Sequence, residues 1–277
     1  MLNLEYLNDL NEAQNEAVSH IDGPLLIVAG AGSGKTKVLT SRIAHMIKQK
    51  KAFPNQILAV TFTNKAAREM QNRVSKILGR EAIGMTWLGT FHSISAKILR
   101  KHAQAVGLKS NFSIIDQDDQ LRLIKNISKA ENIDTKKISP NVIQSIIDRW
   151  KNKGWYPDDV ILRKRDPLEK SFLEIYKIYQ SKLIDLNSTD FGDLILHCVK
   201  IFERNKDISE IYSRNFKYIL VDEYQDTNHI QSKWLLHLAK YHKNISCVGD
   251  DDQSIYSWRG AEIKNFLEFD KIYENTK

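Results

Sequence analysis

The sequence is poor in cysteine and lacks any long apolar segment. Only two of the 277 residues are cysteines, Cys198 and Cys247, and both lie in apolar runs. A disulfide framework is therefore not expected, and a reducing compartment is favoured. No run of about 18 apolar residues occurs and the N-terminus carries no basic region, so we expect no signal peptide, no membrane span and a cytoplasmic location.

Acidic residues are outnumbered by basic ones. The chain holds 41 Lys and Arg against 34 Asp and Glu, which gives a net charge of +7 and a pI near 9.1. Residues 93–215 contain 22 basic and 17 acidic residues, so +5 of the excess lies there and +2 in the remainder. This balance favours a polyanionic partner such as a nucleic acid.

A glycine-rich stretch follows the first apolar run and is the most informative segment. Residues 25–28 are typical of a buried strand, and residues 37–48 have helical spacing. A loop of small residues between them can turn its N–H groups around a phosphate at a helix N-terminus. A lysine there reaches the terminal phosphates and a hydroxyl ligates Mg²⁺. The alternative without a binding function is a glycine-rich turn that is followed by a Lys-Thr pair by chance. The predicted phosphate loop is Ala29, Gly30, Ala31, Gly32, Ser33, Gly34, Lys35 and Thr36, with Ala29 where the strict pattern has glycine.

Strand-like and helix-like segments alternate around this loop. Further strands are predicted at 57–62, 86–90, 218–221 and 245–248, and helices at 11–19 and 65–78. Between Ser93 and Asn215 the hydrophobic period is mostly helical. We therefore predict an α/β fold, in which a parallel-sheet domain of residues 1–92 and 216–277 is interrupted by a mainly helical subdomain, 93–215.

Two adjacent carboxylates follow the strand predicted at 218–221. Asp222 and Glu223 would lie at the C-terminal edge of the sheet, where open α/β sheets bind ligands. Because adjacent carboxylates favour a cation, we assign Asp222 to Mg²⁺ and Glu223 to the activation of water for attack on a γ-phosphate. A solvated acidic turn is the alternative. Gln14, in the helix at 11–19, can contact adenine through its amide or be a plain surface residue.

A polar and aromatic block follows the last predicted strand. Gln253 is placed where a side chain can sense a γ-phosphate. Tyr256, Trp258 and Arg259 form an aromatic and cationic cluster typical of surfaces that stack on unpaired bases. Phe62 could join this surface, although core packing is an equal alternative for it.

Together these segments resemble the UvrD/Rep/PcrA-like superfamily 1 DNA helicases. The matching motifs occur in the family's order and run through essentially the whole chain. They are residues 8–14 (Q motif), 29–36 (Walker A), 61–70 (motif Ia), 89–93 (motif Ib), 222–227 (Walker B) and 248–260 (motif III).

The resemblance implies a RecA-like ATPase domain with an inserted helical subdomain. It also implies ATP hydrolysis with Mg²⁺, coupled to 3′–5′ movement on single-stranded and partly duplex DNA, in repair or replication restart in the bacterial cytosol and without a membrane. The catalytic residues it implies are Lys35, Glu223 and Gln253, with Thr36 and Asp222 at the metal. Its nucleotide contacts are Gln14, Lys37, Arg73 and the phosphate loop. The DNA contacts it implies are Phe62, Asn64, His92, Tyr256, Trp258, Arg259 and Phe191, the last of which could equally be a packing residue.

The family continues into a second RecA-like domain whose arginines close over the γ-phosphate, whereas this sequence stops at Lys277. An arginine of that kind is worth about 10³–10⁵ in rate. We therefore expect these residues alone to bind ATP and DNA with little turnover. Two alternatives are an inactive or regulatory ATP- and DNA-binding fragment, and a generic P-loop kinase or transporter ATPase. The block at 248–260 argues against the second alternative.

Overall fold

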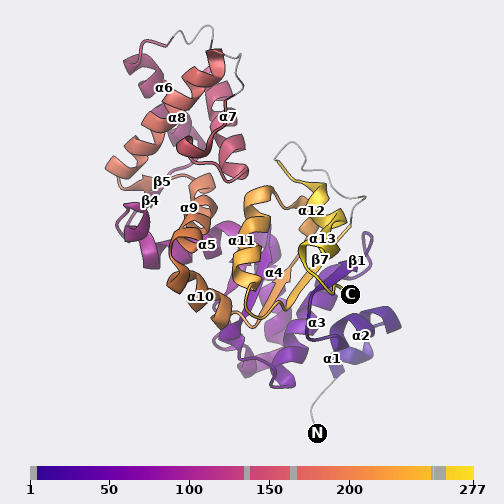
Figure 1. Ribbon diagram of the computed structural model, residues 1–277. Helices are drawn as coiled ribbons and strands as arrows, with labels where there is room; N and C mark the ends of the chain where they lie inside the picture. The colour runs from indigo at the N-terminus through magenta and orange to yellow at the C-terminus, as the bar shows by residue number, and fades with distance from the viewer. Residues whose placement is uncertain (1–4, 134–137, 163–166, 251, 253–259) are drawn as a thin grey trace. The chain divides into compact units, whose positions relative to one another are not determined.

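Five short apolar segments pair into one parallel sheet, as their near-continuous hydrophobicity predicts. The computed structural model describes residues 5–133, 138–162, 167–250, 252 and 260–277 (Figure 1). All neighbouring strands in the sheet are parallel, in the order β1-β7-β6-β2-β3. Because they run the same way, their C-terminal ends lie at one edge of the sheet. The strands are β1 (Leu25–Val28), β2 (Ile57–Thr61), β3 (Leu88–Thr90), β6 (Tyr218–Val221) and β7 (Ile245–Gly249).

Helices cover this sheet and belong with it to one compact unit, residues 1–94, 205–228 and 232–277. The amphipathic helices α3 (Lys35–Lys48) and α4 (Asn64–Leu78) pack their apolar sides on the strands. Their core partners include Ala59 of β2, Leu220 of β6 and Val248 of β7. The remaining helices that lie wholly in this unit are α1 (Glu5–Asn8), α2 (Glu12–Ser19), α10 (Lys206–Asn215), α12 (Ile263–Leu267) and α13 (Phe269–Ile272).

A second compact unit, residues 95–204 and 229–231, is mainly helical. Its core joins α6 (Gln117–Ala130), α7 (Pro140–Asn152) and α8 (Pro167–Asp185). Helix α9 (Phe191–Arg204) belongs to the same unit, as does a parallel pair of two-residue strands, β4 (Ser113–Ile114) and β5 (Ser188–Thr189). Helices α5 (Phe91–His102) and α11 (His229–Ala239) pass from one unit to the other.

The fold class predicted from the sequence is confirmed, and the differences are local. Helix α3 begins at Lys35, two residues earlier than predicted, because Gly34 takes the left-handed conformation at its start. The third strand covers only 88–90 of the predicted 86–90. Segment 206–215 is a helix that groups with the sheet, and the compact units divide at 94/95 and 204/205. The domain boundaries at 92/93 and 215/216 remain a prediction.

Candidate functional site

The loop between β1 and α3 is shaped by its glycines. Gly32 has φ +74° and Gly34 has φ +88°, a left-handed region that disfavours other residues. A β-carbon at Gly34 would also lie 3.0 Å from Gln14 Nε2. Ser33 closes the turn by donating from Oγ to the Gly30 carbonyl at 2.7 Å. The loop is solvent-exposed, and the first turn of α3 has no acidic residue, so the helix N-terminus is open to an anion.

Lys35 and Thr36 in the first turn of α3 meet the two carboxylates that follow β6. Lys35 Nζ lies 3.4 Å from Glu223 Oε2, and Thr36 Oγ1 donates to Asp222 Oδ2 at 3.4 Å. The Lys35 side chain is only 9% exposed, and within the described residues nothing accepts a hydrogen bond from its Nζ. The structure therefore brings together four predicted site residues that are almost 190 positions apart, around a buried ammonium group with unused donors.

Negative charge is concentrated beside this lysine. Burial, together with the neighbouring Glu223, raises the pKa of Asp222 to about 6, although Lys35 and Thr36 act in the opposite direction. Burial and Glu223 also raise the pKa of Asp226 to about 6. Glu223 itself has φ +51°, a conformation that costs a residue other than glycine about 1–3 kcal/mol. Raised carboxyl pKa values and a strained backbone at Glu223 are features of functional sites.

Gln225 is a site residue that the sequence reasoning missed. Its side chain is buried, and its Nε2 donates to Glu223 Oε2 at 2.8 Å. Its Oε1 accepts the backbone N–H of Asp250 at 3.1 Å, just after β7. A β-carbon on Gly249 would lie 2.5 Å from that oxygen, so glycine is required beside it. Gln225 thus holds the Glu223 carboxylate and ties it to the segment that leads to Gln253. Its position within residues 222–227, next to the predicted metal and catalytic carboxylates, was the sequence feature that could have identified it.

Three other predicted nucleotide contacts have protein partners in this structure. Gln14 donates from Nε2 to the Ser33 carbonyl at 2.8 Å, and its Oε1 accepts the Asn11 N–H in a capping box. Lys37 Nζ donates to the Asp9 carbonyl at 2.6 Å. Arg73 forms an exposed ion pair at 2.5 Å with Glu69, one turn earlier on α4, and its nucleotide contact stays a prediction. Gln14 therefore supports the phosphate loop directly, and the adenine contact stays a prediction.

Three predicted DNA contacts among the described residues of the sheet unit follow two neighbouring strands, β2 and β3. Phe62 follows β2, is half-buried and packs on Phe91 with ring centroids 5.4 Å apart. Asn64 is exposed at the start of α4, and burial lowers the pKa of His92 in α5. In the helical unit, Phe191 is the first residue of α9 and is 50% exposed. The predicted DNA contacts Tyr256, Trp258 and Arg259, and the predicted γ-phosphate sensor Gln253, lie outside the described residues.

A model described as the UvrD/REP helicase N-terminal domain matches residues 10–274. The chain belongs to this helicase family. It is 49% identical over 276 residues to a probable DNA helicase II homolog of Rickettsia conorii, which covers 99% of this chain and 42% of that protein. It is 48% identical over 271 residues to the ATP-dependent DNA helicase PcrA of Bacillus subtilis, covering 98% of this chain and 36% of PcrA. The chain thus spans about two fifths of the length of these relatives.

Mg²⁺ with a nucleotide fits the residues that this helicase domain presents. The described residues contain no group of three or more His, Cys, Asp or Glu side chains that could hold a metal on their own. Mg²⁺ is usually held by one or two carboxylates together with phosphates and water. Asp222 and Thr36 would therefore be enough protein ligands for a nucleotide-bound Mg²⁺. In the part of the chain that the structure describes, no helix is long and apolar enough to cross a membrane.

Proposed function

We propose that this chain is the ATP- and DNA-binding part of an ATP-dependent DNA helicase. The observation that carries the proposal is the convergence of Lys35 and Thr36 on Asp222 and Glu223, each pair at 3.4 Å. It is supported by the names of the relatives, which include an ATP-dependent DNA helicase.

The residues divide the work of phosphoryl transfer between them. Loop N–H groups and the start of α3 hold the phosphates, while Lys35 leaves Glu223 and moves to their terminal oxygens. Thr36 and Asp222 would hold Mg²⁺, which supplies charge neutralisation on the β- and γ-phosphates. Glu223, held by Gln225, would then orient the attacking water and accept its proton.

The substrate is proposed to be single-stranded and partly duplex DNA, traversed 3′–5′ during repair or replication in the bacterial cytosol. Support comes from Phe62 and His92 at the strand ends, the exposed Phe191, and the excess of +5 in residues 93–215. The polarity and the pathway rest on the family resemblance. Binding should weaken steeply with salt if the basic segment contacts phosphates.

A second candidate function is binding of ATP and DNA with little turnover by these residues on their own, in an inactive or regulatory role. Residues 1–277 correspond to 36–42% of the length of these relatives, so this candidate concerns these residues and not a whole protein. The resemblance places the γ-phosphate arginines in a second RecA-like domain, which would be the partner for turnover.

ATPase assays with and without oligo(dT) test both candidates. For these 277 residues we expect measurable Mg-ATP binding and a low rate that oligo(dT) raises little. Strong stimulation would contradict the low-turnover view and imply that a second copy supplies the arginines. Absence of both nucleotide and DNA binding would contradict the proposed function itself.

A further inference from the structure

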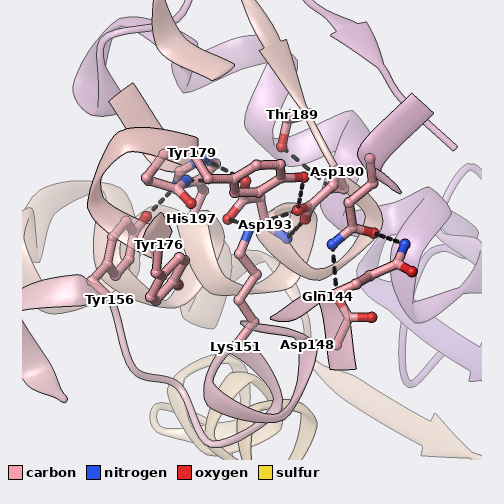
Figure 2. A network of polar contacts seen from close by, with 12 residues as sticks. Gln144, Asp148, Lys151, Tyr156, Tyr176, Tyr179, Thr189, Asp190, Asp193 and His197 are labelled. Carbon is pink, nitrogen blue, oxygen red and sulfur yellow. Dashed lines mark hydrogen bonds and ion pairs between the residues drawn. The ribbon is translucent and has the colours of Figure 1, made fainter. Parts of the chain in front are cut away.

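A buried lysine lies between two aspartates in the helical unit (Figure 2). Lys151, near the end of α7, is fully buried, and its Nζ lies 2.6 Å from Asp190 Oδ2 and 2.8 Å from Asp193 Oδ1. Tyr179 of α8 donates its hydroxyl to Asp190 Oδ2 at 2.8 Å, and Gln180 Nε2 donates to Asp193 Oδ2 at 3.0 Å. The cluster therefore joins α7 and α8 to the start of α9.

The surroundings of Lys151 and Asp193 favour the charged form of both side chains. Burial alone would lower the pKa of Lys151, but the two carboxylates outweigh burial and raise it. Burial would likewise raise the pKa of Asp193, but Lys151, His197 and Gln180 together outweigh burial and lower it. Such a cluster is a poor source of stability, because well-packed apolar side chains of similar volume can stabilise as much or more. The cluster is better explained by the local geometry that it imposes.

That geometry concerns the first turn of α9. Asp190 precedes the helix, and its Oδ1 accepts the Asp193 N–H at 2.9 Å, which is an N-cap bond. A β-carbon on Gly192 would lie 3.0 Å from Lys151 Cδ, so the lysine stem packs directly against this backbone. Both aspartates that flank the turn are thus held by one lysine. Phe191, between them, is 50% exposed although Asp190 and Asp193 are buried.

We propose that Lys151, Asp190 and Asp193 are positioning residues that fix the first turn of α9, so that Phe191 presents its ring to an unpaired base. The inference deepens the proposed function and rests on it, since it takes Phe191 as a DNA contact. A ring held in place before binding loses less conformational entropy when a base stacks on it. An apolar core could also pack α7 against α9, but it would supply neither the N-cap nor the fixed turn.

The first test measures positioning without DNA. Lys151→Met is compared with Lys177→Met, a matched change at an exposed lysine of α8. We expect hydrogen exchange at the amides of residues 191–195 to accelerate at least tenfold in Lys151→Met, beyond any change in the rest of α9, and not in the control. Unchanged or uniformly changed protection would overturn the proposal. If Lys151→Met does not fold, Asp190→Asn takes its place, because asparagine keeps the N-cap while losing the charge that holds Lys151.

The second test measures whether the cluster acts through Phe191. Binding of oligo(dT) containing 2-aminopurine is measured for Lys151→Met, Phe191→Ala and the double variant. We expect about tenfold weaker binding and reduced stacking-dependent quenching for Phe191→Ala. Lys151→Met should weaken binding about fivefold alone and less than twofold in the Phe191→Ala background. Independent, additive effects would overturn the positioning role alone. Unchanged affinity for Phe191→Ala would instead overturn the DNA contact in the proposed function.

Discussion

Two lysines of this chain are almost shielded from solvent, and each lies beside a pair of acidic residues. Lys151 has carboxylate oxygens at 2.6 and 2.8 Å and is fully buried. Lys35 lies 3.4 Å from Glu223, and no residue in the described part of the chain accepts a hydrogen bond from it. One lysine is satisfied by its neighbours, whereas the other keeps donors unused.

The pKa values of the neighbouring acids show the same contrast between the two sites. Burial would raise the pKa of Asp193, but Lys151, His197 and Gln180 together outweigh burial and lower the pKa. Burial raises the pKa of Asp222 to about 6, and Lys35 does not offset it. Because buried polar groups are normally paired, a buried ammonium with unused donors favours a binding role, whereas an ammonium held by two carboxylates favours a structural one. This contrast supports the proposed binding role of Lys35 and the proposed positioning role of the Lys151 cluster.

The largest expected effect is on stability. Lys151→Met should lower the free energy of unfolding by about 3–5 kcal/mol, because it leaves two buried carboxylates without their cation. Urea unfolding followed by circular dichroism measures it. A loss below about 1 kcal/mol would mean that the carboxylates find other partners and that the cluster is not a closed unit.

Lys35→Ala should act on binding instead. We expect affinity for Mg-ADP to fall about 10²-fold, since a charge-assisted contact to phosphate is worth about 1.5–3 kcal/mol. Isothermal titration calorimetry measures it, with Lys76→Ala on the exposed side of α4 as the control. Retained affinity in Lys35→Ala would remove the central support for the phosphate loop.

Asp222→Asn should stabilise the metal-free protein while it weakens Mg-nucleotide binding. In EDTA at pH 8 we expect a gain of about 1–3 kcal/mol, since one pKa unit corresponds to about 1.4 kcal/mol. The folded pKa of about 6 exceeds the ordinary value of 3.8, so the folded state binds the proton more tightly. The unfolding free energy of the unaltered chain therefore falls as pH rises from about 4 to 6.

The advantage of Asp222→Asn should accordingly grow over this pH range and vanish below it. Thermal unfolding of both proteins at pH 4.5, 6 and 8 gives the comparison. A constant difference across these pH values would show that the substitution acts through packing and not through the charge of Asp222.

The smallest expected effect is on the free energy of unfolding of Lys177→Met, a variant at a surface ion pair. Lys177 pairs with Glu174 at 3.1 Å, and both side chains are about half exposed. Lys177→Met should change the unfolding free energy by less than about 0.5 kcal/mol, because water and salt screen such pairs. Urea unfolding of Lys177→Met and Lys151→Met under the same conditions gives the comparison. A similar loss of unfolding free energy in both variants would contradict the distinction between the exposed ion pair and the buried cluster.

The Lys35 site could be predicted from the sequence, whereas the Lys151 cluster could not. The meeting of residues 35–36 with 222–223 followed from a general rule, because parallel strands end at one edge of a sheet. By contrast, Lys151 in the sequence looks like an ordinary charge on a helix. Its partners lie 39 and 42 residues away, and no local pattern signals such contacts.

The shortest strands could not be predicted from the sequence either, because their pairing depends on contacts that are distant in sequence. Strands β4 and β5 have two residues each, which is too short for an alternating pattern to be read. Gln225 was visible inside the acidic block, but its bond to the Asp250 backbone depends on the pairing of β6 with β7. Local periodicity therefore predicted the sheet, whereas the residues that fix its site depend on tertiary packing.

The most direct test of the account is cleavage by Fe²⁺ bound in place of Mg²⁺. With ascorbate, peroxide and ADP, hydroxyl radicals cut the backbone next to the metal. We expect two cuts, one within residues 33–37 and one within 221–224, both dependent on nucleotide and both lost in Asp222→Asn. Cutting at only one of these segments, or at both regardless of nucleotide, would contradict a single shared metal and nucleotide site.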